Sequence, residues 1–197
     1  MKKLNNSGFS LIELIVAVLI MAIIAGGATA AISSVTDMDA DRAAKRIAAA
    51  FKVARTKALA ASDDISEVNP KSYFYVAIFR EGDEIKVGAY KHIWDIHVEG
   101  SSAEVNRATD IEVFDAVPLG SYRLGVRITG QNGGGDIENF DDDGDMVVFA
   151  FRRITGCINP AYTTVGENGK DYTDIYLNGT KNKKLIIVKA TGRIYED

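Results

Sequence analysis

The sequence predicts an α+β protein in which a long N-terminal helix packs on a mainly antiparallel β headgroup. Three observations predict this architecture. There is an apolar run at residues 9–32, a helical periodicity that continues to residue 61, and a series of short strand-like runs from residue 72 onward. With 197 residues, of which 47% are hydrophobic and 25% charged, the chain is long enough for the headgroup to bury a core.

The apolar run extends from Phe9 to Ile32, and only Ser10, Glu13 and Thr29 interrupt it with polar side chains. A helix of this length, at about 1.5 Å per residue, exceeds the roughly 30 Å hydrocarbon core of a bilayer. We therefore expect residues 9–32 to form a transmembrane segment. By the positive-inside rule, the charges on its two sides place the N-terminus in the cytoplasm and the headgroup outside. These charges are Lys2 and Lys3 before the run and Asp37, Asp39 and Asp41 after it.

Two general interpretations fit a basic start followed by an apolar run. A secretory signal peptide would be cleaved at a small-residue site, here Ala28-Thr29-Ala30, whereas a plain single-pass anchor would be retained. Neither interpretation explains Glu13. A carboxylate in an apolar run costs up to about 3 kcal/mol at the centre of a bilayer, and such residues usually have a function and a partner.

The residues around Glu13 resemble a specific processing motif. The segment GFSLIE at residues 8–13, with two lysines before it and the apolar helix after it, is similar to the N-terminus of type IV pilins and type II secretion pseudopilins. The resemblance implies that a prepilin peptidase cuts after Gly8, that residues 1–8 are a leader peptide, and that Phe9 becomes the N-methylated terminus. It also implies that Glu13 pairs with the free amine of Phe9 on a neighbouring subunit during assembly.

The same resemblance implies a structural and non-enzymatic role. The chain would cross the cytoplasmic membrane once and then enter a pilus (a fimbrium) or a type II secretion pseudopilus. Its partners would be copies of itself, other pilins or pseudopilins, an assembly platform protein and a cytoplasmic ATPase.

The closing stretch of the headgroup carries a second resemblance. Residues 174–194 contain a hydrophobic strand, a Thr-Gly turn and a short final strand, and they are similar to the C-terminal part of H-type minor pseudopilins and related minor pilins. We therefore expect a minor pilin or pseudopilin. Two alternatives stay open: a DNA-binding minor pilin of a competence pilus, and a plain membrane-anchored extracytoplasmic binding protein.

Helical periodicity continues beyond the apolar run. From residue 39 to residue 61, apolar residues recur in steps of three and four, and charged residues fill much of the remaining surface, which predicts an amphipathic helix with one face on the headgroup. The recurring apolar positions are Ala44, Ile47, Phe51, Ala54 and Ala58. We expect residues 9–61 to form a single helix, about 80 Å long if it is continuous. Gly26-Gly27 within it permits either close helix packing or a hinge.

The headgroup, residues 62–197, contains short runs of β-forming residues that turn signals separate. Glu81-Gly82-Asp83 predicts a hairpin turn between the first two of these runs. The expected strands cover residues 73–80, 84–90, 93–98, 111–114, 122–128, 146–151, 174–177, 184–189 and 193–195.

Few side chains in the headgroup are candidates for chemistry. Cys157 is the only cysteine, which rules out an intrachain disulfide, and we expect it to be a buried small residue. The only histidines, His92 and His97, are expected to pack or to face solvent rather than to form a site. The sequence predicts no catalytic residue and no organic cofactor.

An acidic run at residues 139–145 is the one candidate metal site. Oxygen-bearing side chains alternate there beside Gly144, which permits a sharp turn, but the run lacks the glutamate that completes an EF-hand loop. A solvated acidic turn is the favoured interpretation and calcium binding is the alternative. The candidate calcium ligands are Asn139, Asp141, Asp143 and Asp145.

Nucleic acid is not an expected partner. The formal net charge is −4, and the last two residues, Glu196 and Asp197, are acidic. Binding to a phosphate backbone requires clustered cations. A group of lysines near the C-terminus is the local exception, formed by Lys181, Lys183, Lys184 and Lys189.

Overall fold

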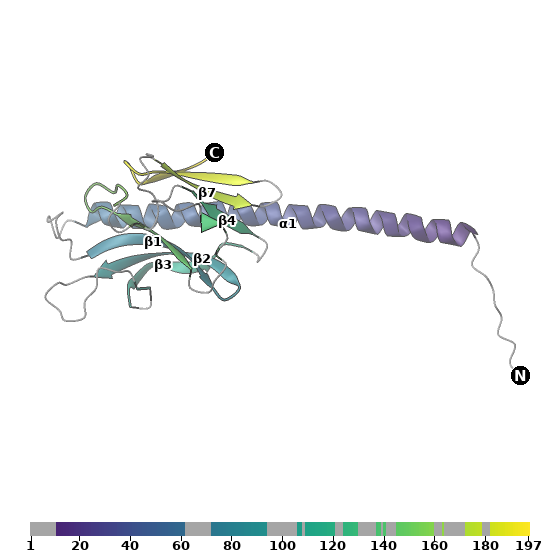
Figure 1. The fold of residues 1–197 in the computed structure, drawn as a ribbon, viewed down its shortest axis with the longest axis horizontal. Helices are drawn as coiled ribbons and strands as arrows, with labels where there is room; N and C mark the ends of the chain where they lie inside the picture. Colours follow the sequence, from purple (N-terminus) through teal and green to yellow (C-terminus); the bar gives the residue numbers. More distant parts are fainter. Residues whose placement is uncertain are drawn as a thin grey trace, which may run out of the picture. The chain divides into compact units, whose positions relative to one another are not determined.

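The computed structural model describes the larger part of the chain (Figure 1). The chain divides into two compact units, Met1–Val35 and Thr36–Asp197, and each of them is described by itself below. The described residues are 11–61, 72–93, 106–107, 109–120, 124–129, 137–138, 140, 145–159, 163, 172–178 and 182–197.

A single α-helix, α1, extends from Leu11 to Ala60. The sequence favours this helix because it contains no proline and is rich in alanine, the residue with the highest helix propensity. The backbone is helical through Gly26 and Gly27, so these two glycines do not interrupt α1. Phe9 and Ser10, the first residues of the expected helix, lie outside the described residues.

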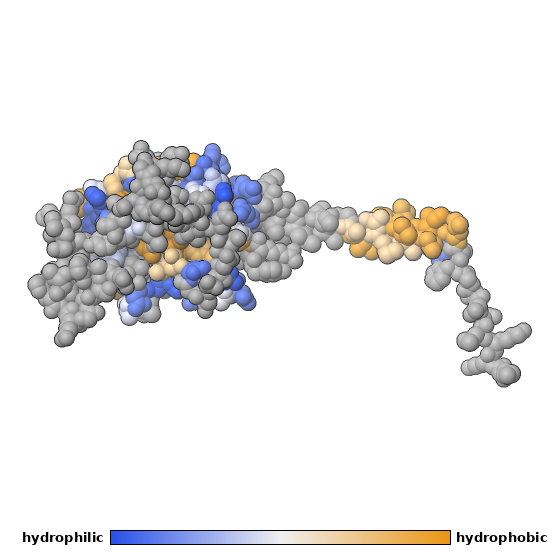
Figure 2. All heavy atoms as spheres, viewed as in Figure 1, coloured by the Kyte–Doolittle hydropathy of each residue, from blue (hydrophilic) through white to orange (hydrophobic). Residues whose placement is uncertain are grey.

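In the first unit, the described side chains of α1 are exposed on every side of the helix, and all of them except Glu13 are apolar. Residues 11–25 are all exposed, including Leu11, Ile12, Ile23 and Ile24, each of which exposes more than 60% of its surface. Figure 2 shows these residues as a continuous apolar surface. Among the described residues, no helix combines the length and the hydropathy that a membrane crossing requires. The membrane span expected at residues 9–32 stays a prediction.

The second unit contains two antiparallel sheets, and the α+β class predicted from the sequence is confirmed. The first sheet has the strand order β3-β2-β1-β6, and the second has the order β5-β4-β7-β8-β9. The strands of the first sheet are β1 (Ser72–Glu81), β2 (Glu84–Ile93), β3 (Ile111–Pro118) and β6 (Met146–Phe151). The strands of the second sheet are β4 (Gly125–Ile128), β5 (Ile137–Glu138), β7 (Tyr172–Asn178), β8 (Lys183–Val188) and β9 (Arg193–Glu196).

Most of these strands agree with the sequence prediction. The hairpin between β1 and β2 turns at Gly82, whose positive φ of 59° suits a glycine. The largest differences in bounds are that β2 extends to Ile93, β3 extends to Pro118 and β4 begins only at Gly125, and other ends differ by one or two residues. The two-residue strand β5 was not predicted, and residues 94–98 of an expected strand lie outside the described residues.

The core of the second unit lies between one face of α1 and both sheets. All five helix positions that the periodicity predicted to be apolar contacts are buried, with at most 2% of their surface exposed. They join one cluster with side chains from the first sheet, such as Val76 and Phe149, and from the second sheet, such as Val126 and Ile187. The prediction that one face of the helix packs on the headgroup is therefore confirmed.

The C-terminal hairpin of β8 and β9 is fastened to the rest of this unit without a disulfide. Its turn accepts two hydrogen bonds, from Arg55 Nε to the carbonyl of Thr191 (2.8 Å) and from Cys157 Sγ to the carbonyl of Ala190 (2.8 Å). Gly192, with φ 62°, lies directly against the backbone of Gly156. Cys157 is only half-buried, so its expected full burial was wrong.

Replacing Gly192 with alanine should destabilise the headgroup strongly. The new Cβ atom would overlap the carbonyl oxygen of Gly156, and its backbone would keep an unfavourable positive φ. Together these effects should lower the free energy of unfolding by about 3 kcal/mol. Urea-induced unfolding of the full chain in detergent, followed by fluorescence, measures this change.

Gly82→Ala is the matched control for this prediction. Gly82 has the same positive φ, but a Cβ atom there would meet nothing within 4 Å. Only the backbone cost of about 1 kcal/mol should therefore appear. Equal losses in the two variants would show that the contact between Gly192 and Gly156 contributes nothing to stability.

Candidate functional site

The predicted processing and assembly residues lie at the start of α1. Gly8 and Phe9 lie outside the described residues, whereas Glu13 is exposed in the first turn of the helix. Glu13 is surrounded by large apolar neighbours, among them Leu11, Ile12 and Leu14, which are also exposed. The arrangement presents one carboxylate within an otherwise apolar helix surface.

This surface requires an apolar environment. A helix that is hydrophobic on all sides is normally buried, either in a membrane or among other helices, because exposed apolar area of this extent is unfavourable in water. Once such a helix is buried, a carboxylate on it needs a cation or hydrogen-bond donors, since the penalty for an isolated buried charge is several kcal/mol. An exposed carboxylate on an apolar helix is an arrangement that suits helix association coupled to charge neutralisation.

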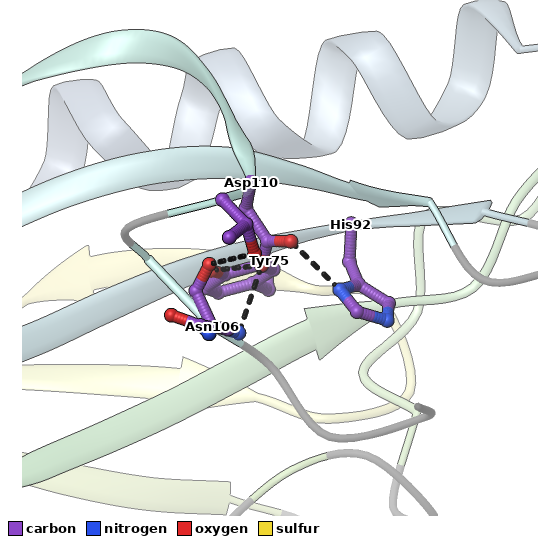
Figure 3. A network of polar contacts seen from close by, with 5 residues as sticks. Tyr75, His92, Asn106 and Asp110 are labelled. Atoms are coloured by element: carbon purple, nitrogen blue, oxygen red, sulfur yellow. Dashed lines mark hydrogen bonds and ion pairs between the residues drawn. The ribbon is translucent and has the colours of Figure 1, made fainter. Parts of the chain in front are cut away.

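The second unit contains a buried polar network that the sequence analysis did not predict (Figure 3). His92 Nδ1 lies 2.8 Å from Asp110 Oδ1, and the two side chains expose only 6% and 5% of their surfaces. The hydroxyl of Tyr75 donates to Asp110 Oδ2 at 2.6 Å, and the backbone N–H of Asn106 donates to the same oxygen at 3.2 Å. Asp110 thus accepts hydrogen bonds from Tyr75 of β1 and from Asn106, which precedes β3. It is also paired with His92 near the end of β2.

Tyrosine rings surround this network on the face of the first sheet that points away from α1. Tyr73 lies against His92 and Tyr75 stacks on Tyr90, with ring centroids 5.0 and 5.3 Å apart. Burial raises the pKa of Tyr75 above its usual value, and the hydrogen bond to Asp110 raises this pKa further. Tyr75 is therefore protonated at neutral pH and acts as a donor, so the network fixes the residues before β3 onto the sheet.

Sequence reasoning expected His92 either to pack or to face solvent; the structure buries it, and its partner Asp110 was not predicted. Asp110 precedes β3 and is far from His92 and Tyr75 along the chain, so no sequence motif indicates that the three residues meet. The sequence offered only a weaker indication: Tyr90 and His92 lie on the same face of one strand, which is the pattern expected when polar rings cover a sheet.

Little of the acidic run proposed for calcium is described. Asn139, Asp141 and Asp143 lie outside the described residues. Of Asp145, the structure shows that its backbone carbonyl accepts a hydrogen bond from the backbone N–H of Arg80 (2.9 Å). Across the described parts of the chain, no group of three or more potential metal-ligating side chains comes together. The calcium site stays a prediction.

Two of the four lysines near the C-terminus, Lys183 and Lys184, are paired with carboxylates. Lys183 Nζ lies 3.0 Å from Asp41 and 2.5 Å from Glu196, and Lys184 Nζ lies 3.3 Å from Asp174. These carboxylates raise the pKa of Lys183, mainly through its hydrogen bonds to Glu196 and Asp41. Lys181 lies outside the described residues. The paired charges count against this group as a nucleic-acid surface.

Comparison with known protein families identifies the N-terminal segment. Residues 3–29 match the prokaryotic N-terminal methylation motif, which includes Gly8, Phe9 and Glu13. In this segment the chain is similar to type IV pilin-like proteins, because it carries their prepilin N-methylation motif. No curated protein and no solved structure matches the chain. Proteins with this motif are typically non-enzymatic. The match ends at residue 29, before the headgroup, so the resemblance to H-type minor pseudopilins stays a prediction.

Removing the carboxylate of Asp110 should unfold the headgroup of the pilin-like protein more easily. Asp110→Ala leaves the buried hydroxyl of Tyr75 and the ring of His92 without their acceptor, which should lower the free energy of unfolding by about 3 kcal/mol. Asp115→Ala, at an exposed position of β3, is the control and should change stability by less than about 0.5 kcal/mol. Denaturant unfolding of both variants compares them, and similar losses would contradict a structural role for the network.

Proposed function

We propose that this pilin-like protein is a structural subunit, a minor pilin or pseudopilin, of a type IV pilus or type II secretion filament. The observation that carries the proposal is the match of residues 3–29 to the prokaryotic N-terminal methylation motif. Two further features support it: the side chains of residues 11–25 form an apolar surface all around α1, and the Ala-rich face of the same helix is buried in the headgroup.

Before assembly, the subunit is anchored in the cytoplasmic membrane with its N-terminus in the cytoplasm and its headgroup outside. The lysines before the apolar segment, Lys2 and Lys3, support this orientation. Prepilin peptidase then cuts after Gly8, which removes both lysines and frees the amine of Phe9. During assembly, other pilins take the place of lipid around residues 9–32, and a platform protein supports the process.

The charge of Glu13 sets the position of each new subunit. In the filament its carboxylate pairs with the amine of Phe9 on a neighbour, so neither charge is left alone in an apolar environment. The same pair forms at every step, between unlike surfaces of identical helices. A contact of this type does not close on itself, and it therefore produces an open helical fibre.

The proposal predicts the N-terminus of the native protein. Mass spectrometry of the protein from its own cells should find a chain that begins with a methylated Phe9. Retention of Met1 would instead indicate a plain anchor, and a chain that begins at Ala31 would indicate a secretory signal peptide. Either result would overturn the proposed processing. Gly8→Val, which blocks cleavage, should leave the precursor in the membrane.

Substitution of Glu13 should separate membrane insertion from assembly. Glu13→Ala removes the pairing charge, so we expect a processed protein that stays in the membrane and enters filaments at least about tenfold less than the wild type. Glu13→Asp keeps the charge and should retain most of the incorporation. Immunoblots of sheared filaments and of membranes measure the two pools. Unchanged incorporation of Glu13→Ala would exclude a pairing role.

A further inference from the structure

Both sheets of the second unit end in edge strands, whose backbone N–H and C=O groups can pair with a further strand. The edges of the first sheet are β3 and β6, and those of the second sheet are β5 and β9. An edge strand that is long, exposed and apolar pairs readily with other chains and leads to aggregation unless the sequence prevents it. The protection of each edge is therefore informative about the headgroup.

Three of these four edges are short or already paired. The strand β5 has only two residues and β9 has four. The strand β6 is bonded to residues that follow it, because Asn159 N donates to Ala150 O (2.8 Å) and Ala150 N donates to the hydroxyl of Thr163 (3.0 Å). Phe151 and Ile158 also form a β-bridge. A further strand therefore finds little backbone to pair with at these edges.

The remaining edge, β3, is the longest and the most vulnerable. It contains eight residues, and none of them is buried. Half of these positions carry large side chains that favour β-strands, namely Ile111, Val113, Phe114 and Val117. Glu112 and Asp115 are the only charged residues among them. An exposed segment of this composition is expected to aggregate unless charged residues act as gatekeepers.

Two irregularities distort the pairing of β3 with β2. Two steps along β2, from Val87 to Ala89, correspond to three steps along β3. A second irregularity follows directly, between Ala89 and Tyr90. A β-bulge bends its strand, increases the local twist and leaves the extra residue out of the ladder. The N–H of a residue left out in this way needs another acceptor, because otherwise it offers a bonding position to an incoming strand.

Glu112 supplies that acceptor at the first irregularity. Ala116 lies between Phe114 and Val117, the two residues of β3 that pair with β2 on either side of it. Its backbone N–H donates to Oε1 of Glu112 at 2.7 Å. Donor and acceptor both belong to β3, and Glu112 is exposed. The strand thus uses one of its own carboxylates to occupy this N–H, and a charged acceptor makes a stronger hydrogen bond than a neutral one.

We propose that Glu112 is a gatekeeper that prevents the addition of a further strand at the β3 edge. Its carboxylate occupies the N–H of Ala116, so an incoming strand has to break this bond before it can accept from the same N–H. The inference goes beyond the proposed filament function and does not depend on it, because it concerns the headgroup alone. In a membrane, where headgroups are held at high local concentration, the same bond keeps them from pairing edge to edge.

Self-association of the full chain in detergent micelles tests the gatekeeper role. Glu112→Ala frees the N–H of Ala116, so we expect association at a protein concentration about tenfold lower than for the wild type. Sedimentation velocity over a concentration series measures this change. Hydrogen exchange followed by mass spectrometry locates the contact, and the peptide 111–118 should become more protected as association proceeds. Glu112→Val, which keeps a strand-favouring residue without an acceptor, should behave in the same way.

Two control variants separate the hydrogen bond from the charge. Glu112→Gln loses the charge but keeps a side-chain oxygen that can accept from Ala116. Asp115→Asn removes the other carboxylate of β3 and leaves the bond between Glu112 and Ala116 in place. Both variants should associate within about threefold of the wild-type concentration, because the N–H of Ala116 still has an acceptor. Near-UV circular dichroism verifies that every variant is folded.

Three outcomes would overturn the proposal. Equal association of wild type and Glu112→Ala would show that this residue does not guard the edge. Protection of a peptide other than 111–118 would place the contact on another surface. Equally strong association of Glu112→Ala, Glu112→Gln and Asp115→Asn would assign the protection to negative charge and not to the occupied N–H. Leader processing and entry into filaments play no part in this test, so the proposed function can fail while this inference holds.

Discussion

The headgroup depends on the close packing of an alanine-rich face of α1 between two sheets. Residues that contact both sheets from the helix are mostly alanine, and Ala43, Ala50, Ala54 and Ala58 have no exposed surface. Small side chains allow the sheets to approach the helix backbone, and any larger side chain at these positions would overpack the core. Ile47 and Phe51 are the exceptions, and Phe51 lies between Phe149 and Phe151 of β6, with ring centroids 5.1 and 5.8 Å away.

The same helix meets its surroundings in two different ways. In the headgroup it buries small side chains against sheets that belong to its own chain. At its N-terminal end it exposes large aliphatic side chains, with no face reserved for the solvent. A physical reason explains why the buried side chains are small and the exposed ones are large. The sheets belong to the same chain and pack against the helix at a fixed distance, which small side chains allow. Large flexible side chains can instead adapt first to lipid and then to neighbouring helices.

The sequence predicted the elements whose signals are local. Short runs of β-forming residues between turn signals identified β1, β2 and β6, Gly82 marked the hairpin turn, and the three-and-four spacing identified the buried face of α1. The motif at the N-terminus was also visible, because it is a contiguous run that includes Glu13. Each of these signals lies within a few residues of chain.

The features that sequence reasoning missed depend on contacts between distant residues. The carboxylate of Asp110 is a binding partner only because β1, β2 and the start of β3 come together, and nothing near Asp110 indicates this. The contact of Gly156 with Gly192 likewise joins two turns that are separate in the chain. The lysine group was misleading for the same reason, since its acidic partner Asp41 lies on α1.

The last strand links the stability of the headgroup to its surface charge. β9 is the last strand of the second sheet, and at about 3.3 Å per residue its four residues span roughly 10 Å. Arg193 begins the strand beside the turn that Arg55 holds, and Glu196 ends it at Lys183. The register of β9 on β8 therefore determines where both charges lie. A shift of this register would move Arg193 away from the turn that Arg55 holds and Glu196 away from Lys183 together, so the contacts that hold the C-terminus also fix the positions of both charges.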